Sequence, residues 1–167
     1  PREQDLLIGT FGRALWVMDD IRPLRAIATD PEILNKDFHL FDPPTGYQVA
    51  YQQPTGSRFG GDAMYGGENK KSGAMISYFV GKGSEDLKEK DSISFEFFDQ
   101  DRLMRTIKMP RPKKAGIHRW YWRMDEKGVQ RPRRSLRKSK VEPSGVSVLP
   151  GTYIIKGALG ESSNETA

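Results

Sequence analysis

The stretch that decides the fold is SISFEFFDQDRLMRTIKM, residues 92–109. In its first half, Ile93, Phe95 and Phe97 alternate with polar residues, and a polar run at 99–102 precedes the apolar return over Leu103–Met109. Because successive side chains of a strand point to opposite faces, this alternation predicts a β-hairpin with one buried face.

Short runs rich in aromatic and β-branched residues lie on both sides of this hairpin, and Gly and Pro separate them. Such runs are typical of strands, so we expect an all-β fold. A helix is predicted only at Ile21–Thr29, capped by Asp20 and ended by the Asp30-Pro31 pair. The further strands are expected at Leu6–Gly9, Ala14–Met18, Phe38–Phe41, Tyr47–Tyr51, Ala74–Val80, Ile117–Met124 and Thr152–Leu159.

The centre of the core is predicted from the run Ile117–Met124. His118, Trp120 and Trp122 fall on one face of this strand, and each Trp can bury about 150–250 Å². Packing together with Phe95, Phe97 and Tyr153 is therefore expected. Two stretches rich in Gly, Pro and polar residues, 53–72 and 128–150, are predicted to be loops.

Composition excludes several classes of function. The chain has 167 residues and no Cys, so it holds no disulfide, Cys-based zinc site or thiol nucleophile. No apolar run is long enough for a transmembrane helix, and we expect no membrane insertion. No catalytic triad, phosphate-binding loop or dinucleotide fingerprint is present, and two His are too few for a metal cluster. We therefore expect no catalytic residue, cofactor or metal within this chain.

The charge is uneven along the sequence. The chain carries a net charge of +5, yet residues 102–140 contain 15 Lys and Arg against two acids. A solvated basic face is the simpler interpretation, and a polyanion site is the alternative. Nucleic acid is not expected, because no nucleic-acid motif is recognised, so acidic polysaccharide or glycan is the better candidate. The candidate contacts are Arg131, Arg133, Arg134, Arg137, Lys138 and Lys140.

Three further groups are weighed as sites. Asp19 and Asp20 are adjacent on a strand and so cannot easily flank one glycosidic bond; a turn with a helix cap is favoured. Asp99 and Asp101 are explained by a hairpin turn rather than by calcium, which needs six to eight oxygen ligands. The run 120–122 offers a sugar-stacking platform only if a ring faces solvent, and core packing is favoured.

The segment Gly9–Asp20, GTFGRALWVMDD, resembles the closing segment of sortilin-like, neuraminidase-repeat β-propellers of secreted bacterial proteins. Later motifs resemble, in the same order, the immunoglobulin-like sandwich of the flagellar hook-capping type that follows such propellers. These motifs are Pro23-Leu24-Arg25, Leu40–Pro43, Gly73–Tyr78 and Pro150–Tyr153. The family tends to carry Trp-Asp, an apolar residue and then Arg, whereas this chain has Trp122-Arg123-Met124-Asp125, so the family's salt bridge is not expected to carry over.

The resemblance implies a division of the chain. Residues 1–20 are expected to close a propeller blade, 21–36 to form a helical linker, 37–160 to form an immunoglobulin-like sandwich of about seven strands, and 161–167 to form a tail. The propeller junction is expected at Arg13, Trp16, Asp19 and Asp20.

The implied function is that of a non-catalytic C-terminal module, extracellular or periplasmic. It would pack on its own upstream propeller, and the resemblance allows the whole protein to be a glycoside hydrolase. The alternative is an accessory carbohydrate- or polyanion-binding module. Exposed apolar residues in the first 20 positions would also favour a homodimer.

Overall fold

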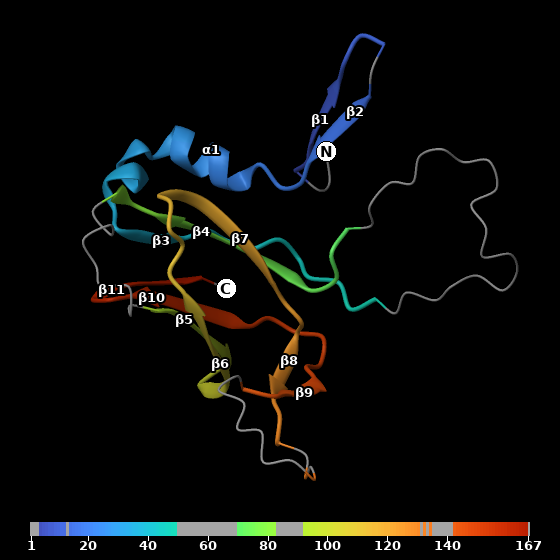
Figure 1. Ribbon diagram of the computed structural model, residues 1–167, viewed down its shortest axis with the longest axis vertical. Helices are drawn as coiled ribbons and strands as arrows, with labels where there is room; N and C mark the ends of the chain where they lie inside the picture. Colours follow the sequence, from blue (N-terminus) through green and yellow to red (C-terminus); the bar gives the residue numbers. More distant parts are fainter. Residues whose placement is uncertain are drawn as a thin grey trace, which may run out of the picture.

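The computed structural model describes residues 4–12, 14–49, 70–82, 92–130, 132, 134 and 142–166 (Figure 1). The described residues are mostly β-strand, with one α-helix, α1 (Arg22–Thr29), and one 3-10 helix, η1 (Pro31–Asn35). The all-β prediction is confirmed at this level. The strands are β1 (Leu6–Gly9), β2 (Leu15–Met18), β3 (Phe38–Leu40), β4 (Ala74–Val80), β5 (Ser92–Asp99), β6 (Arg102–Pro110), β7 (Gly116–Trp122), β8 (Asp125–Lys127), β9 (Ser144–Ser147), β10 (Ile154–Leu159) and β11 (Ser162–Thr166).

Two antiparallel sheets form the body of the molecule. One has the strand order β11-β10-β5-β6 and the other β3-β4-β7 (Figure 1). The predicted hairpin is confirmed as β5 and β6, which pair from Ser92↔Pro110 to Asp99↔Arg102 with one irregularity near Phe97. Two smaller antiparallel pairs, β1-β2 and β8-β9, complete the described strands.

The core lies between these two sheets. Phe95 and Phe97 on β5 are fully buried, and Trp122 on β7 is 3% exposed. Trp120 and Tyr153 pack against the same cluster while remaining partly exposed. The prediction that the Trp-rich face of Ile117–Met124 looks inward is therefore confirmed.

A second, smaller cluster covers the outer face of the three-stranded sheet. Ile33 of η1 packs there with Phe41 and Phe79, and Ala26 and Ile27 of α1 add to it. The helix begins one residue later than expected, and the predicted cap is wrong. Ile21 is the N-cap residue, and Asp20 instead accepts the N–H of Arg22 through its side chain.

Three strands were not predicted, because they show no apolar alternation. β8 is charged, β9 is exposed throughout, and β11 is polar. The expected tail at 161–167 thus contains a strand paired with β10 over Ser162–Thr166. Conversely, the strand predicted at Tyr47–Tyr51 is reduced to one bridge, Tyr47↔Gly73, among its described residues.

The first and last strands of the body meet at one edge. β11 pairs with β10 as the edge strand of the four-stranded sheet and contacts β3 of the other sheet. The Thr166 hydroxyl donates a hydrogen bond to the Asp42 carboxylate just beyond β3. This contact ties the two sheets together where β11 ends.

Candidate functional site: an apolar hairpin on a fixed base

The hairpin β1-β2 projects from the body (Figure 1). Its residues are apolar on both faces. Residues opposite one another in an antiparallel pair share a face. The pairs Leu6↔Met18 and Ile8↔Trp16 therefore occupy one face, while Leu7↔Val17 and Gly9↔Leu15 occupy the other. Each of the seven apolar side chains involved exposes between 41% and 65% of its surface.

The edges of this hairpin are open as well. Within the described residues, β1 and β2 form a sheet of two strands, so neither has a partner on its outer side. A two-stranded ribbon is marginal in water, and unpaired edges invite another strand. Strands that are covered on both faces are typically apolar along their whole length, and β1 and β2 have this composition.

The base of the hairpin is fixed to the helix that follows it. The Asp20 N–H donates to the Asp5 carboxylate at 2.8 Å, and the Ile21 N–H donates to the Gln4 carbonyl at 2.8 Å. Gln4 and Asp20 both have left-handed backbone, with φ of 56° and 49°. The backbone therefore bends on both sides of the hairpin, just before β1 and just after β2, where the hairpin leaves the body.

Charged groups hold this bend. Arg119 on β7 donates from its two terminal nitrogens to the backbone carbonyls of Asp19 and Asp20. The Asp20 side chain is 2% exposed and accepts a hydrogen bond from Arg22 Nε at 2.5 Å. Burial raises the pKa of the nearby Tyr121 hydroxyl, and the Asp19 charge adds to the rise. The base is thus joined to β7 of the body by charge-assisted hydrogen bonds, which are the stronger class.

The structure places three of the four predicted junction residues. Trp16 is exposed on the hairpin, whereas Asp19 is half-buried and Asp20 fully buried in the base. Arg13 lies outside the described residues. Asp19 and Asp20 thus hold the hairpin by their backbone carbonyls, a role that residue type alone does not reveal.

The basic segment is not one surface in the described part of the chain. Arg105 forms an ion pair with Asp125 in which both side chains are 8% exposed. Arg102 pairs with Glu126, Lys127 approaches Glu142, and Arg119 holds the hairpin base. Arg134 is exposed, and the other polyanion candidates, Arg131, Arg133, Arg137, Lys138 and Lys140, lie outside the described residues.

The aromatic run at 120–122 does not form one exposed strip. Trp120 and Trp122 pack toward the core, while Tyr121 lies on the opposite face with its hydroxyl 3.3 Å from the Met75 sulfur. Among the described residues, no three His, Asp or Glu side chains are grouped as a metal ion would need, and this includes Asp99 and Asp101.

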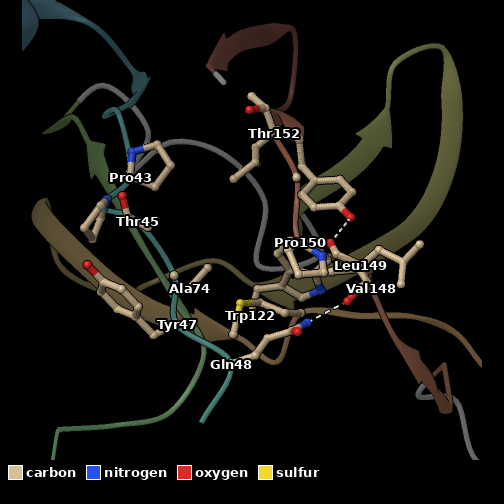
Figure 2. Close-up of a pocket in the computed structure, with 16 residues that line it drawn as sticks. Pro43, Thr45, Tyr47, Gln48, Ala74, Trp122, Val148, Leu149, Pro150 and Thr152 are labelled. Atoms are coloured by element: carbon tan, nitrogen blue, oxygen red, sulfur yellow. Dashed lines mark hydrogen bonds between the residues drawn. The ribbon is translucent and has the colours of Figure 1, made fainter.

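A second feature, not predicted from the sequence, is a cleft of about 540 Å³ between two extended segments (Figure 2). Pro43–Gln48 forms one wall and Val148–Tyr153 the other, and Trp122 lies at the floor. The walls are about 100 residues apart in the sequence, so no local pattern reveals the cleft. Their only local signal is the density of proline, at Pro43, Pro44 and Pro150.

Comparison with known proteins gives no match: no family model, curated protein or solved structure is significantly similar to this chain. In the described part of the structure, neither helix has the length and apolar character needed to cross a bilayer.

Proposed function

We propose that this chain is a non-catalytic β-module whose hairpin β1-β2 inserts into an upstream β-propeller of the same polypeptide and stabilises it. The body would be an immunoglobulin-like sandwich, and the protein would act outside the cytoplasm. The propeller would carry any glycosidase-like activity, so this assignment rests on the resemblance of Gly9–Asp20 together with the geometry of the hairpin.

One observation carries the proposal: the hairpin is apolar on both faces, open at both edges and fixed at its base. Adjacent blades of a propeller cover both faces of each blade, which suits a ribbon such as β1-β2. Burial of its side chains would add roughly 25 cal/mol for each Å² of apolar surface removed from water. A sugar-binding face would instead need polar edges around an exposed ring.

Trp16 offers a direct test, because it is 65% exposed while Trp120 and Trp122 lie in or against the core. The test compares acrylamide quenching of tryptophan fluorescence in the 167-residue chain and in the natural polypeptide that includes everything encoded before Pro1. We expect strong quenching in the short chain and protection in the longer one. The variant Trp16→Phe, made in both, identifies the quenched signal.

Two results would contradict the proposal. One is equal quenching of Trp16 in both proteins. The other is a gene that starts close to Pro1 and encodes no blade-length repeats upstream. Self-association of the short chain, lost in Leu7→Ser, would instead indicate that the hairpin joins two copies.

The second candidate function is a polyanion-binding module, favoured by the 15 basic residues between positions 102 and 140. Because several of these cations already hold partners within the body, the contacts would come from residues 131–140. Titration with polygalacturonate at low and high salt tests this, since binding by charge weakens as salt rises. Unchanged affinity after Arg131, Arg133 and Arg134 are all replaced by Gln would exclude it.

A further inference from the structure

A second hollow, of about 370 Å³, adjoins the lower end of the cleft. The residues that line both are Tyr47, Gln48 and Met124. Both hollows also follow the same two segments, because the lining runs on from Gln48 to Val49 on one side and from Val148 to Ser147 on the other. The Gln48 side-chain amide donates to the Val148 carbonyl at 2.7 Å and marks the boundary (Figure 2). A ligand longer than the cleft would extend into the second hollow.

Arg123 gives this second hollow, called here the Arg123 hollow, its charge. Among the described residues that line it, Arg123 is the one charged side chain. The other polar side chains of the lining are neutral and belong to Tyr47, Gln48, Ser72 and Ser147. Arg105 and Arg119 hold partners within the body, whereas the exposed Arg123 side chain has no ion pair or hydrogen bond in the part of the chain that the structure describes. A guanidinium matches a planar carboxylate through two parallel hydrogen bonds, so this hollow fits a group with one negative charge.

The cleft itself carries no charge. None of the described residues that line it is Asp, Glu, Lys, Arg or His. Its floor is apolar, since the buried side chains of Met124 and Ile155 lie there with Trp122. The Trp122 indole N–H already donates to a backbone carbonyl, and the Tyr153 hydroxyl does the same. The cleft therefore favours an uncharged body that needs no hydrogen-bond donor from the floor.

Other anionic ligands fit these two hollows less well. A phosphate ester carries about two negative charges, which the single guanidinium of Arg123 does not balance. A sugar acid would press its hydroxyl groups against the apolar floor, and burying a hydroxyl without a hydrogen bond is unfavourable. An aliphatic chain has no polar group to lose there. Each wall of the cleft has six residues, or up to roughly 20 Å of extended backbone, so the cleft has the length for such a chain.

We propose that the cleft and the Arg123 hollow together bind a medium-chain aliphatic carboxylate. The carboxylate accepts hydrogen bonds from the Arg123 guanidinium, and the chain passes Gln48 and lies over the floor beside Trp122. This inference is independent of the proposed role of the hairpin and of the basic segment 131–140, because it uses none of their residues.

The test is an NMR titration of the 15N-labelled chain at pH 7 with sodium hexanoate, octanoate and decanoate, each kept below the concentration at which it forms micelles. We expect saturable shifts at the backbone amides of Gly46 and 151–153 and at the side-chain amide of Gln48, which lies between the two hollows. Affinity should rise about fourfold for each CH₂ group added, because each one is buried in the cleft.

Two variants separate the charged end from the chain. Arg123→Gln should weaken octanoate binding about fivefold and leave the binding of 1-octanol unchanged, because the alcohol has the same chain without the charge. Lys113→Gln is its control, since it removes one exposed cation outside both hollows and should affect neither ligand. Thr152→Trp fills the cleft from an exposed lining position and should weaken both ligands about tenfold. Thr29→Trp, exposed at the end of α1, should weaken neither.

The proposal is overturned if no carboxylate gives saturable shifts at the cleft, or if affinity does not depend on chain length. It is also overturned if Arg123→Gln weakens octanoate no more than Lys113→Gln does. Shifts confined to β1 and β2 would overturn it as well, because they would show that the chain coats the apolar hairpin instead.

Discussion

The indole ring of Trp122 lies stacked on the ring of Phe97, with centroids 4.1 Å apart and planes 23° from parallel. This contact joins β7 of one sheet to β5 of the other at the centre of the core. Tyr153 meets the same indole edge-on at 6.0 Å. The two sheets are thus held by aromatic packing that comes from three separate parts of the chain.

Replacing Trp122 by Ala should lower the free energy of unfolding by about 3–5 kcal/mol, because it leaves a large cavity beside Phe97. Urea melts measure this. Trp16→Ala is the control and should change stability by no more than about 0.5 kcal/mol, since Trp16 is exposed. A loss below about 1 kcal/mol for Trp122→Ala would show that the indole does not support the core.

Arg119→Lys should loosen the base of the hairpin without unfolding the body. A lysine ammonium is a single point and cannot reproduce the planar fork that reaches the carbonyls of both Asp19 and Asp20. Amide hydrogen exchange of Ile8 and Trp16, whose N–H groups face the partner strand of the hairpin, should accelerate about tenfold while that of β5 stays constant. Arg123→Lys, an exposed neighbour, should alter neither; equal acceleration in both variants would contradict the role of Arg119.

The buried ion pair of Arg105 and Asp125 should be costly to break from one side. Arg105→Met alone should destabilise the protein by about 3–5 kcal/mol, because the Asp125 carboxylate is left buried without its partner. The double variant Arg105→Met/Asp125→Leu should be closer to the parent than the sum of the single changes. Chemical unfolding of all three variants gives the coupling energy.

Arg102→Met is the control for that cycle. Arg102 pairs with Glu126 at 2.8 Å but is 60% exposed, so its loss should cost less than about 1 kcal/mol. Strict additivity of the Arg105 and Asp125 variants would show that the two groups do not interact.

Stability should fall when the pH falls below about 6.5, the ordinary pKa of His. Burial lowers the pKa of His39, the Lys36 charge lowers it further, and Asp30 and Asp42 partly oppose this. The His39 ring therefore binds a proton at a higher pH in the unfolded chain than in the folded one. The stability that the neutral ring contributes above pH 6.5 is lost as the pH falls through the folded pKa. The buried Nδ1 of His39 has no hydrogen-bond partner in the described structure, which fits a neutral ring.

Urea melts between pH 7 and pH 5 check this dependence. His39→Phe should flatten it, because the ring packs edge-on against Phe41 at 4.9 Å and Phe keeps that contact. His118→Gln, at the chain's other histidine, should retain the slope. An unchanged slope in His39→Phe would assign the pH dependence to other groups.

The sequence predicts the strands that are rich in apolar residues and misses those that are mostly polar or charged. Phe95 and Trp122 lie in alternating runs, so their strands and inward faces follow from the pattern. Ser144–Ser147 and Ser162–Thr166 gain their structure from backbone pairing with partners elsewhere in the chain, which leaves no apolar signal. At Tyr47 a strand was predicted, but the described residues form only one bridge there. Pro43 and Pro44, just before the expected strand, have no N–H group to donate to a neighbouring strand.

The candidate sites were predictable to different degrees. The apolar character of Leu6–Gly9 and Leu15–Met18 is plain in the sequence, but their exposure is a property of the folded chain. The cleft depends on Gln48 meeting Val148, a contact between segments that share no motif. Long-range packing of this kind cannot be inferred from local propensity.

The bond between Asp42 and Thr166 also constrains when folding can finish. The two residues are separated by 124 positions, so a ribosome must release nearly the whole described body before β11 can take its place beside β3. Until then β10 presents an open edge on the side where β11 will pair, at the stage when nascent chains aggregate most readily. Chaperone binding during synthesis should therefore include β10 and end there once β11 emerges.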